Sequence, residues 1–176
     1  MKKNNDKEII EVQLKRKVRS HIDIRSRCHL GLPVVTFVPP NLDDGTPFPT
    51  TYWLTCPLLV QRVSSLEASG MVKLFDGIIQ KKGSFRTLWK KRQKTYEEER
   101  RLLKIDSGHI SPEGGVGGTS DHVKCLHAHL ADHLATGKNP IGQTIESLIG
   151  GNDCTVPCVD GGEGRVKFNS EWKNKW

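Results

Sequence analysis

The chain has 176 residues, enough for one domain with a sizeable core, and its composition is lean, with 35% hydrophobic and 6% aromatic residues. Its 27 basic and 20 acidic residues give a net charge of +7, which favours weak association with polyanions but does not require a nucleic-acid function. No apolar run approaches the roughly 20 residues of a membrane span, and the N-terminus lacks the apolar stretch of a signal peptide, so a cytoplasmic protein with no membrane partner is expected.

Composition divides the chain into three parts. Residues 1–19 form a basic N-terminal segment, residues 20–151 a single globular domain, and residues 152–176 a basic tail with cysteine and glycine. Within the first part, residues 6–17 fit a helix and a strand about equally well. The number of cysteines, five, is odd, which argues against a complete disulfide framework. In a reducing compartment they would be buried thiols, metal ligands or reactive groups.

The next part of the chain predicts strands. Residues 21–27 alternate apolar and polar side chains, and residues 34–38 are rich in β-branched ones. A β-hairpin with its tip at residues 28–31 is therefore expected. A proline-rich loop over residues 39–49 then leads to a short strand at residues 51–55.

Helix signals follow from residue 57 onward. Pro57 and Pro140 suit the first turn of a helix, and Gly70 and Gly137 suit its end. With the apolar periodicity, these signals predict helices over residues 57–69, 71–80, 84–103, 120–136 and 139–149. The expected fold class is α+β, with a small N-terminal antiparallel sheet packed with four to five helices.

The helix that begins near Ser84 predicts a charged face. Lys90, Lys91 and Arg92 are followed by the acidic residues 97–99. Ion pairs on a solvated face are the favoured interpretation. The alternative is a basic nucleic-acid-associated module that uses these side chains together with the terminal lysines.

The most informative segment runs from His122 to His133. An α-helix turns about 100° per residue, so Cys125, His129 and His133, four apart, would form one polar stripe, with His127 on the apolar side. Thiol and imidazole groups bind soft or borderline metals and carry out nucleophilic or proton-transfer chemistry near neutral pH. This segment is therefore expected to contribute to a Cys/His site.

Zinc binding is the best concrete form of that site. Zinc takes four ligands in a tetrahedron, usually from pairs brought together in space. Cys154 and Cys158 could supply a second pair, but Cys-x3-Cys is a looser signal than Cys-x2-Cys. The expected ligands lie in separate segments: Cys28, Cys56, Cys125, His127 and His129.

Two other interpretations involve the same region. Cys125, beside Lys124 and His129, could be a nucleophile with a general base, in a thiol- or metal-dependent hydrolytic enzyme. The run Gly114–Gly118 could present backbone N–H groups to an anion, with Gly117, Gly118 and Lys124 as binding residues. No phosphate-binding-loop pattern accompanies the glycines, so an exposed, mobile loop is the favoured expectation.

Several blocks of the sequence resemble a known family. They are Arg27–Pro33, Asp44–Pro57, Ser65–Gly70, Val123–Ala128 and Asn139–Gly142. Together they resemble the bacterial domain-of-unknown-function family 501, over about residues 20–151. The resemblance implies a small cytoplasmic bacterial protein with no established activity. It places Cys28, Cys56, Cys125 and His127 within its motif blocks.

The functional expectation is thus an uncharacterised protein with a Cys/His site, with zinc as the expected cofactor. The turn at Cys28, the junction at Cys56 and the helix start at Cys125 are expected to converge on that site. Cys154 and Cys158, outside the resemblance, are expected to tolerate substitution.

Overall fold

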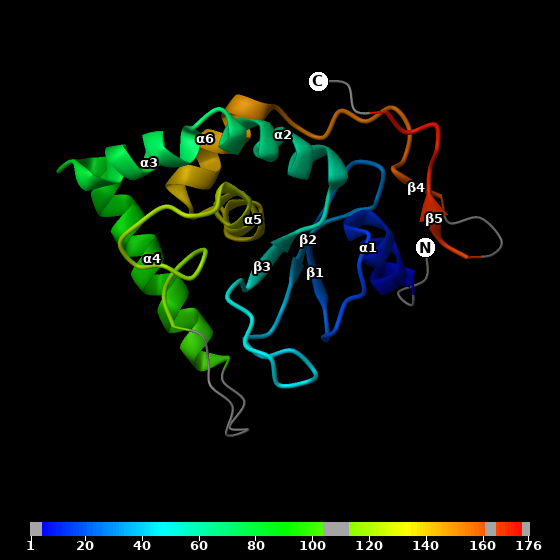
Figure 1. The fold of residues 1–176 in the computed structure, drawn as a ribbon, viewed down its shortest axis with the longest axis horizontal. Helices are drawn as coiled ribbons and strands as arrows, with labels where there is room; N and C mark the ends of the chain where they lie inside the picture. The colour runs from blue at the N-terminus through cyan, green and yellow to red at the C-terminus, as the bar shows by residue number, and fades with distance from the viewer. Residues whose placement is uncertain (1–4, 104–112, 161–164, 174–176) are drawn as a thin grey trace.

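A β-hairpin with a third strand added to it forms the centre of the computed structural model, which describes residues 5–103, 113–160 and 165–173 (Figure 1). The strands are β1 (Asp23–Arg27), β2 (Pro33–Phe37) and β3 (Tyr52–Leu54), antiparallel in the order β1-β2-β3. At the hairpin tip the Cys28 N–H donates to the Leu32 carbonyl at 2.9 Å. The predicted hairpin is confirmed.

Six helices belong to the described part of the chain. They are α1 (Asp6–Leu14), α2 (Pro57–Ala68), α3 (Met71–Gln80), α4 (Ser84–Leu102), α5 (Leu126–Thr136) and α6 (Pro140–Ile149). The predicted class, an α+β fold in which a small N-terminal sheet packs with helices, is confirmed. The additional helix is α1, where the sequence pattern left helix and strand open.

Helix α5 is the centre of the helical part. Figure 1 shows it nearly end-on among α2, α6 and the sheet, and it packs against α6, β3 and α2. Leu126, Leu130 and Ala131 are fully buried, but so are His129 and Asp132. The predicted polar stripe is therefore wrong, because neighbouring elements cover almost every side of this helix. The helix also begins at residue 126, later than the predicted residue 120.

Helix α6 crosses α5 at a glycine. A Cβ atom at Gly142 would lie 2.2 Å from the His129 carbonyl oxygen and 2.4 Å from the His133 Cβ, so the two helices meet where no side chain fits. The preceding Asn139 caps α6, as predicted, because its Oδ1 accepts from the Gly142 N–H at 3.0 Å. Pro140 occupies the first position of α6, also as predicted.

A buried polar network joins α4 to α5. The Arg92 guanidinium donates to both carboxylate oxygens of Asp132, at 2.8 and 2.6 Å, and also contacts Glu99 at 2.9 Å. Asn139 Nδ2 donates to Asp132 at 2.9 Å, and the amide group of Asn139 contacts His129 Nδ1, with Nδ2 at 3.0 Å and Oδ1 at 3.3 Å from it. The Nε2 atom of His129 is buried and has no hydrogen-bond partner among the described residues.

The predicted charged face of α4 needs correction. Lys90 and Lys91 are exposed, but Arg92 is 3% exposed and points into the network described above. Arg100 is likewise buried and donates to the carbonyls of Phe48 and Pro49. Two of the guanidinium groups on this helix thus hold the fold together, and Arg92 does not belong to a polyanion-binding surface.

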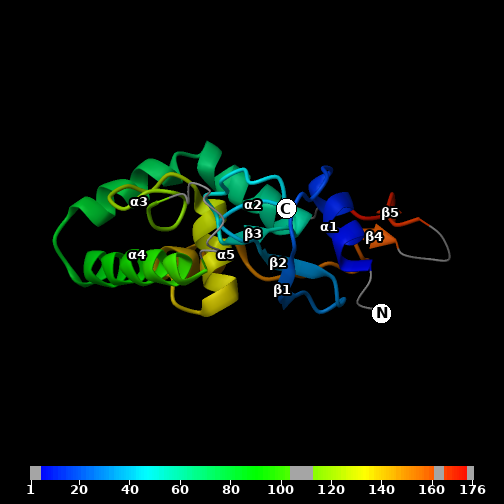
Figure 2. The same cartoon turned by 90° about the horizontal axis from the view of Figure 1, so that it is seen from below.

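The flanking segments pack together at one end of the elongated molecule (Figure 2). There α1 contacts a two-stranded ribbon of β4 (Val159–Asp160) and β5 (Lys167–Phe168). A small hydrophobic cluster joins them to the hairpin: Ile9, Leu32, Cys158, Val159 and Val166. Parts of the predicted N-terminal segment and C-terminal tail are therefore ordered and packed on the central sheet.

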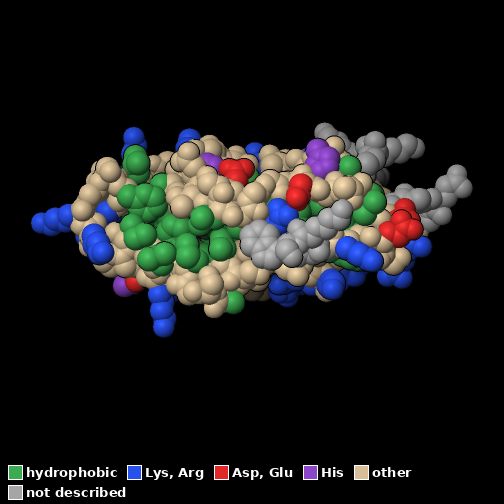
Figure 3. Space-filling model, turned by 90° about the horizontal axis from the view of Figure 1, so that it is seen from above, with side chains coloured by type: hydrophobic (Ala, Val, Ile, Leu, Met, Phe, Trp, Pro, Cys, Tyr) green, Lys and Arg blue, Asp and Glu red, His purple; other side chains and the backbone are tan. Residues whose placement is uncertain are grey.

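One face of the molecule carries a patch of hydrophobic side chains (Figure 3). Large hydrophobic residues exposed in the structure include Leu74 and Ile78 of α3, Leu88 of α4 and Leu148 of α6. These side chains are distributed over separate helices. Among the described residues, no helix combines the length and the apolar character needed to cross a membrane.

The buried ion pair generates a first prediction. Arg92→Met should destabilise the protein by about 3–5 kcal/mol, because the fully buried Asp132 loses its counter-ion. Lys91→Met, on the exposed side of the same helix, should change stability by less than about 0.5 kcal/mol. Urea denaturation of both variants measures the difference. Equal effects of the two substitutions would contradict the structural role of the pair.

His129 generates a second prediction. Burial lowers its pKa to about 4, against which the bond from Asn139 and the charge of Asp132 act more weakly. The folded protein thus binds a proton at His129 less tightly than the unfolded chain does. The resulting contribution to the free energy of unfolding is fully present above about pH 6.5 and is lost as the pH falls toward 4. The loss should be on the order of 3 kcal/mol. His129→Gln should flatten this pH dependence in urea denaturation series, whereas His122→Gln, at an exposed position, should leave it unchanged.

Candidate functional site

The structure divides the five expected metal ligands among three places. Cys125 and His127 lie together beside α2, Cys28 and Cys56 line a pocket elsewhere, and His129 is in the core. The expected convergence of Cys28, Cys56 and Cys125 is not found. Cys56 precedes the first residue of α2, whereas Cys125 lies by its last turn, and a helix of 12 residues is about 18 Å long.

A group of three side chains at the start of α5 is the strongest candidate site. Glu67, in the last turn of α2, joins Cys125 and His127, and one ligand atom of each lies within 4.8 Å of the others. Cys125 is the N-cap residue of α5, and the Glu67 carboxylate accepts from the Leu126 N–H at 2.7 Å. All three residues are half-buried, so solvent and small molecules can reach them.

The hydrogen bonds of His127 define its orientation. Nε2 lies 3.1 Å from the Val60 carbonyl oxygen, which can only accept, so Nε2 carries a proton. Ser64 Oγ lies 3.2 Å from the same nitrogen. Nδ1 therefore faces the Glu67 carboxylate, at 3.2 Å, and the Cys125 side chain.

Three electron-pair donors thus converge on one point. A neutral imidazole would turn the lone pair of Nδ1 toward a carboxylate oxygen, which is unfavourable unless a cation lies between them. A proton can fill that role. Burial opposes the charge of His127, but its hydrogen bond with Cys125, the charge of Glu67 and the Val60 carbonyl outweigh burial and raise its pKa to about 9.

A zinc ion also fits this geometry. Zn–N and Zn–O bonds of about 2.0–2.2 Å at a tetrahedral angle place the two ligand atoms about 3.4 Å apart. The distance from His127 Nδ1 to Glu67 Oε1 is 3.2 Å. The donation from Nε2 to a backbone carbonyl is the outer contact that typically orients a zinc-bound histidine.

Glu67 was missed by reasoning that searched for thiols and imidazoles. The sequence feature that could have pointed to Glu67 is the block Ser65–Gly70, where this carboxylate comes three residues before a helix-ending glycine. Sequence spacing alone does not show that the end of α2 meets the start of α5.

The other histidines of this segment have separate partners. His122 is exposed and lies 3.3 Å from Asp76 of α3, whose carboxylate also accepts from the Val123 N–H. His133 contacts Glu146 of α6 at 3.1 Å. Neither of them lies in the three-residue group.

The glycine loop is packed, contrary to the expected exposure. Val116 is 1% exposed, and its N–H donates to Gln93 Oε1 at 2.8 Å, while the N–H of Gly118 donates to the Gly115 carbonyl. Gly117 and Gly118 adopt positive φ angles and are half-buried, and Lys124 is exposed. Two of the N–H groups that the anion hypothesis would use therefore already have protein partners.

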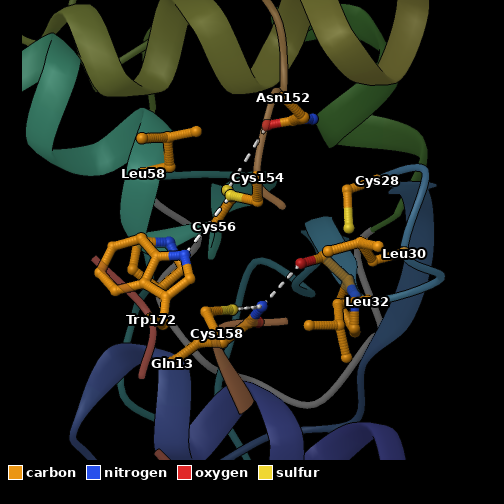
Figure 4. A pocket seen from close by; sticks show the side chains of 12 residues that line it. Gln13, Cys28, Leu30, Leu32, Cys56, Leu58, Asn152, Cys154, Cys158 and Trp172 are labelled. Carbon is orange, nitrogen blue, oxygen red and sulfur yellow. Dashed lines mark hydrogen bonds between the residues drawn. The ribbon is translucent and has the colours of Figure 1, made fainter. Parts of the chain in front are cut away.

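Cys28 and Cys56 line a small pocket together with Cys154 and Cys158 (Figure 4). Burial raises the pKa of Cys56 to about 12, although the N–H groups of Leu59 and Leu58 oppose this, and burial also raises the pKa of Cys158. These two side chains are therefore neutral thiols at pH 7, which excludes them as free thiolate nucleophiles.

The comparisons with known proteins agree with the motif resemblance. A family model described as "Protein of unknown function (DUF501)" matches residues 24–147, well over half of the chain. The matched region includes Glu67, Cys125 and His127 and ends before Cys154. Comparison with curated proteins and with solved structures found no match. The chain belongs to the DUF501 family.

Proposed function

We propose that this protein binds one zinc ion through Glu67 Oε1, Cys125 Sγ and His127 Nδ1. The observation that carries the proposal is the convergence of these three electron-pair donors within 4.8 Å, with the Nδ1 of His127 turned toward a carboxylate. Carboxylate, thiolate and imidazole together suit a borderline divalent ion.

The surroundings of the three ligands support this assignment. The Val60 carbonyl and the Ser64 hydroxyl fix the imidazole ring from its far side. Glu67 is held by the Leu126 N–H at the start of α5. Two of the three ligands, Glu67 and His127, are thus oriented by contacts that metal binding does not need to break, which reduces the entropy lost on binding.

Three protein ligands and partial exposure suit a site with an open position. Structural zinc sites are usually closed by four protein ligands, whereas catalytic ones leave one position for water. A zinc ion held in this way lowers the pKa of its bound water to about 7 and can polarise a carbonyl or phosphoryl oxygen. Metal-dependent hydrolysis is the reaction class that this chemistry favours.

A second candidate function rests on the contact between Cys125 and His127. An imidazole in contact with a thiol is the arrangement in which a nucleophile has its acid–base partner beside it. Thiol-based catalysis uses Cys125 and His127 without a metal. The two candidates differ in the role of Glu67, which is a ligand in the first and a neighbour that orients His127 in the second.

Substitutions of the three ligands test the zinc proposal. Cys125→Ser and Glu67→Gln should each remove one equivalent of zinc per chain and weaken binding at least about 100-fold, because loss of an outer-shell contact alone typically costs 10–100-fold. Glutamine retains the oxygen that accepts from Leu126, so Glu67→Gln should fold normally. Elemental analysis of untagged protein measures the zinc content.

His122→Gln is the matched control, since His122 also pairs with a carboxylate but lies outside the three-residue group. It should retain all of its zinc. If Cys125→Ser and Glu67→Gln retain zinc like the wild type, the site is not a zinc site. Rapid modification of Cys125 by iodoacetamide in zinc-free protein, slowed by His127→Gln, would then favour the thiol function.

Zinc affinity should also depend on pH. Binding displaces the proton from His127 Nδ1, whose pKa is raised to about 9, so the apparent affinity should rise about tenfold per pH unit between pH 7 and 9 from this group alone. Competition with a zinc-sensitive dye at several pH values gives the slope. A flat profile over this range would show that His127 is not a ligand.

A further inference from the structure

Four of the five cysteines meet at one small pocket, at the opposite end of α2 from the Glu67 group. Cys28 is at the hairpin tip, Cys56 precedes α2, and Cys154 and Cys158 come from the C-terminal segment (Figure 4). The cavity between them has a volume of about 10 Å³, room for a single water-sized particle. All four side chains are free thiols in the structure.

N–H groups of side chains donate to two of the four sulfur atoms. Trp172 Nε1 donates to Cys154 Sγ at 3.4 Å, and Gln13 Nε2 donates to Cys158 Sγ at 3.7 Å. Cys56 lies at the N-cap position of α2, where the N–H groups of Leu58 and Leu59 favour a negative charge on its sulfur. A neutral thiol is a weak acceptor, so these donors gain little from it, whereas N–H···S bonds to a metal thiolate are characteristic outer contacts.

The remaining neighbours of the pocket are compatible with thiolate ligands. Cys56 Sγ lies 3.6 Å from Asn152 Oδ1. Exchange of the amide oxygen and nitrogen of Asn152 would replace this acceptor with an N–H donor to the Cys56 sulfur. His29 Nε2 donates to the Cys154 carbonyl at 2.9 Å and connects the hairpin tip to the C-terminal segment. The rest of the lining is largely apolar and includes Leu30 and Leu32.

We propose that Cys28, Cys56, Cys154 and Cys158 form a closed, structural zinc site, distinct from the Glu67 site. Four thiolates in a tetrahedron are a set that zinc prefers, and the Cys154-x3-Cys158 spacing is within its usual range. The ion would join the hairpin, α2 and the C-terminal segment. The role is structural, because four protein ligands leave no position for a substrate.

Formation of this site requires the sulfur atoms to move closer together. Zn–S bonds of about 2.3 Å place sulfur atoms about 3.8 Å apart. In the structure, no three of these sulfur atoms lie within 4.8 Å of one another. Among the described residues, only the Glu67, Cys125 and His127 group meets that distance. Cys154 and Cys158 lie on irregular backbone before the short strand β4, and Cys28 lies in a turn, so three of the four ligands are on segments that can adjust. Zinc binding releases the four thiol protons to solvent.

The test uses the untagged full chain, with zinc content by elemental analysis and Co²⁺ as an optical probe under reducing, anaerobic conditions. The wild type should hold two zinc ions per chain, and Cys154→Ser and Cys125→Ser should hold one each. Substitution of Cys154 should remove most of the sulfur-to-cobalt charge-transfer absorption, since four of the five bound sulfurs belong to this site. Cys125→Ser should remove only a small part of it.

Different results would contradict the two proposed zinc sites. If Cys125→Ser loses no metal but Cys154→Ser does, only the Glu67 site is disproved. If Cys154→Ser retains the wild-type zinc content and cobalt spectrum, the four-cysteine site is disproved. Should the variant fail to fold, the wild-type cobalt spectrum decides, because a spectrum with a single sulfur ligand contradicts the proposal. A disulfide that includes Cys154 in freshly isolated protein, with no second zinc ion, would contradict it as well.

Discussion

The buried ion pair between Arg92 and Asp132 is the interaction on which the helical part depends. It places a cation of α4 against a carboxylate in the middle of α5, and Asn139 extends the network to the start of α6. An unpaired buried charge strongly destabilises a fold, so only the arrangement of the three helices that completes this pair is stable. The close crossing at Gly142 then fixes how α6 lies on α5. Together these contacts fix the position of Cys125, at which α5 begins.

Helix α2 connects the two cysteine-containing regions. Cys56 directly precedes its first turn, and Glu67 lies in its last turn, so one rigid element supports a residue of each region. At its C-terminal end, Glu67 both accepts from the N-terminus of α5 and faces His127. A carboxylate that caps a helix is stabilised there whether or not a metal is present. This explains how the three-residue group can be well ordered before any ligand binds.

Much of the fold was predictable because its signals are local. Pro57, Gly70, Asn139 and Pro140 mark helix ends through their own backbone preferences, and the hairpin tip at residues 28–31 follows from strand periodicity. The environment of α5 was not predictable in this way. A prediction from periodicity assumes one solvent-exposed face and one buried face. Helix α5 is instead surrounded by other elements, so His129, which was assigned to the polar face, lies in the core.

The candidate sites show the same limit, because spacing within one helix does not reveal which distant segments meet. Thus Cys125 and His127 were identified but Glu67 was not, and Cys154 and Cys158 were set aside although they line the pocket of Cys28 and Cys56.

The packing of α1 on the β4–β5 ribbon has a consequence for the order in which the chain can fold. Helix α1 is synthesised about 150 residues before the strands that cover it, residues 159–160 and 167–168. Contacts between segments so far apart in sequence close late and slowly. During synthesis, the apolar side chain of Ile9 must remain without its final cover from Val159 and Val166 while the central sheet and α5 assemble. The hairpin and the helices around α5 form from a continuous stretch of chain, so that half can be complete before the other end of the molecule closes.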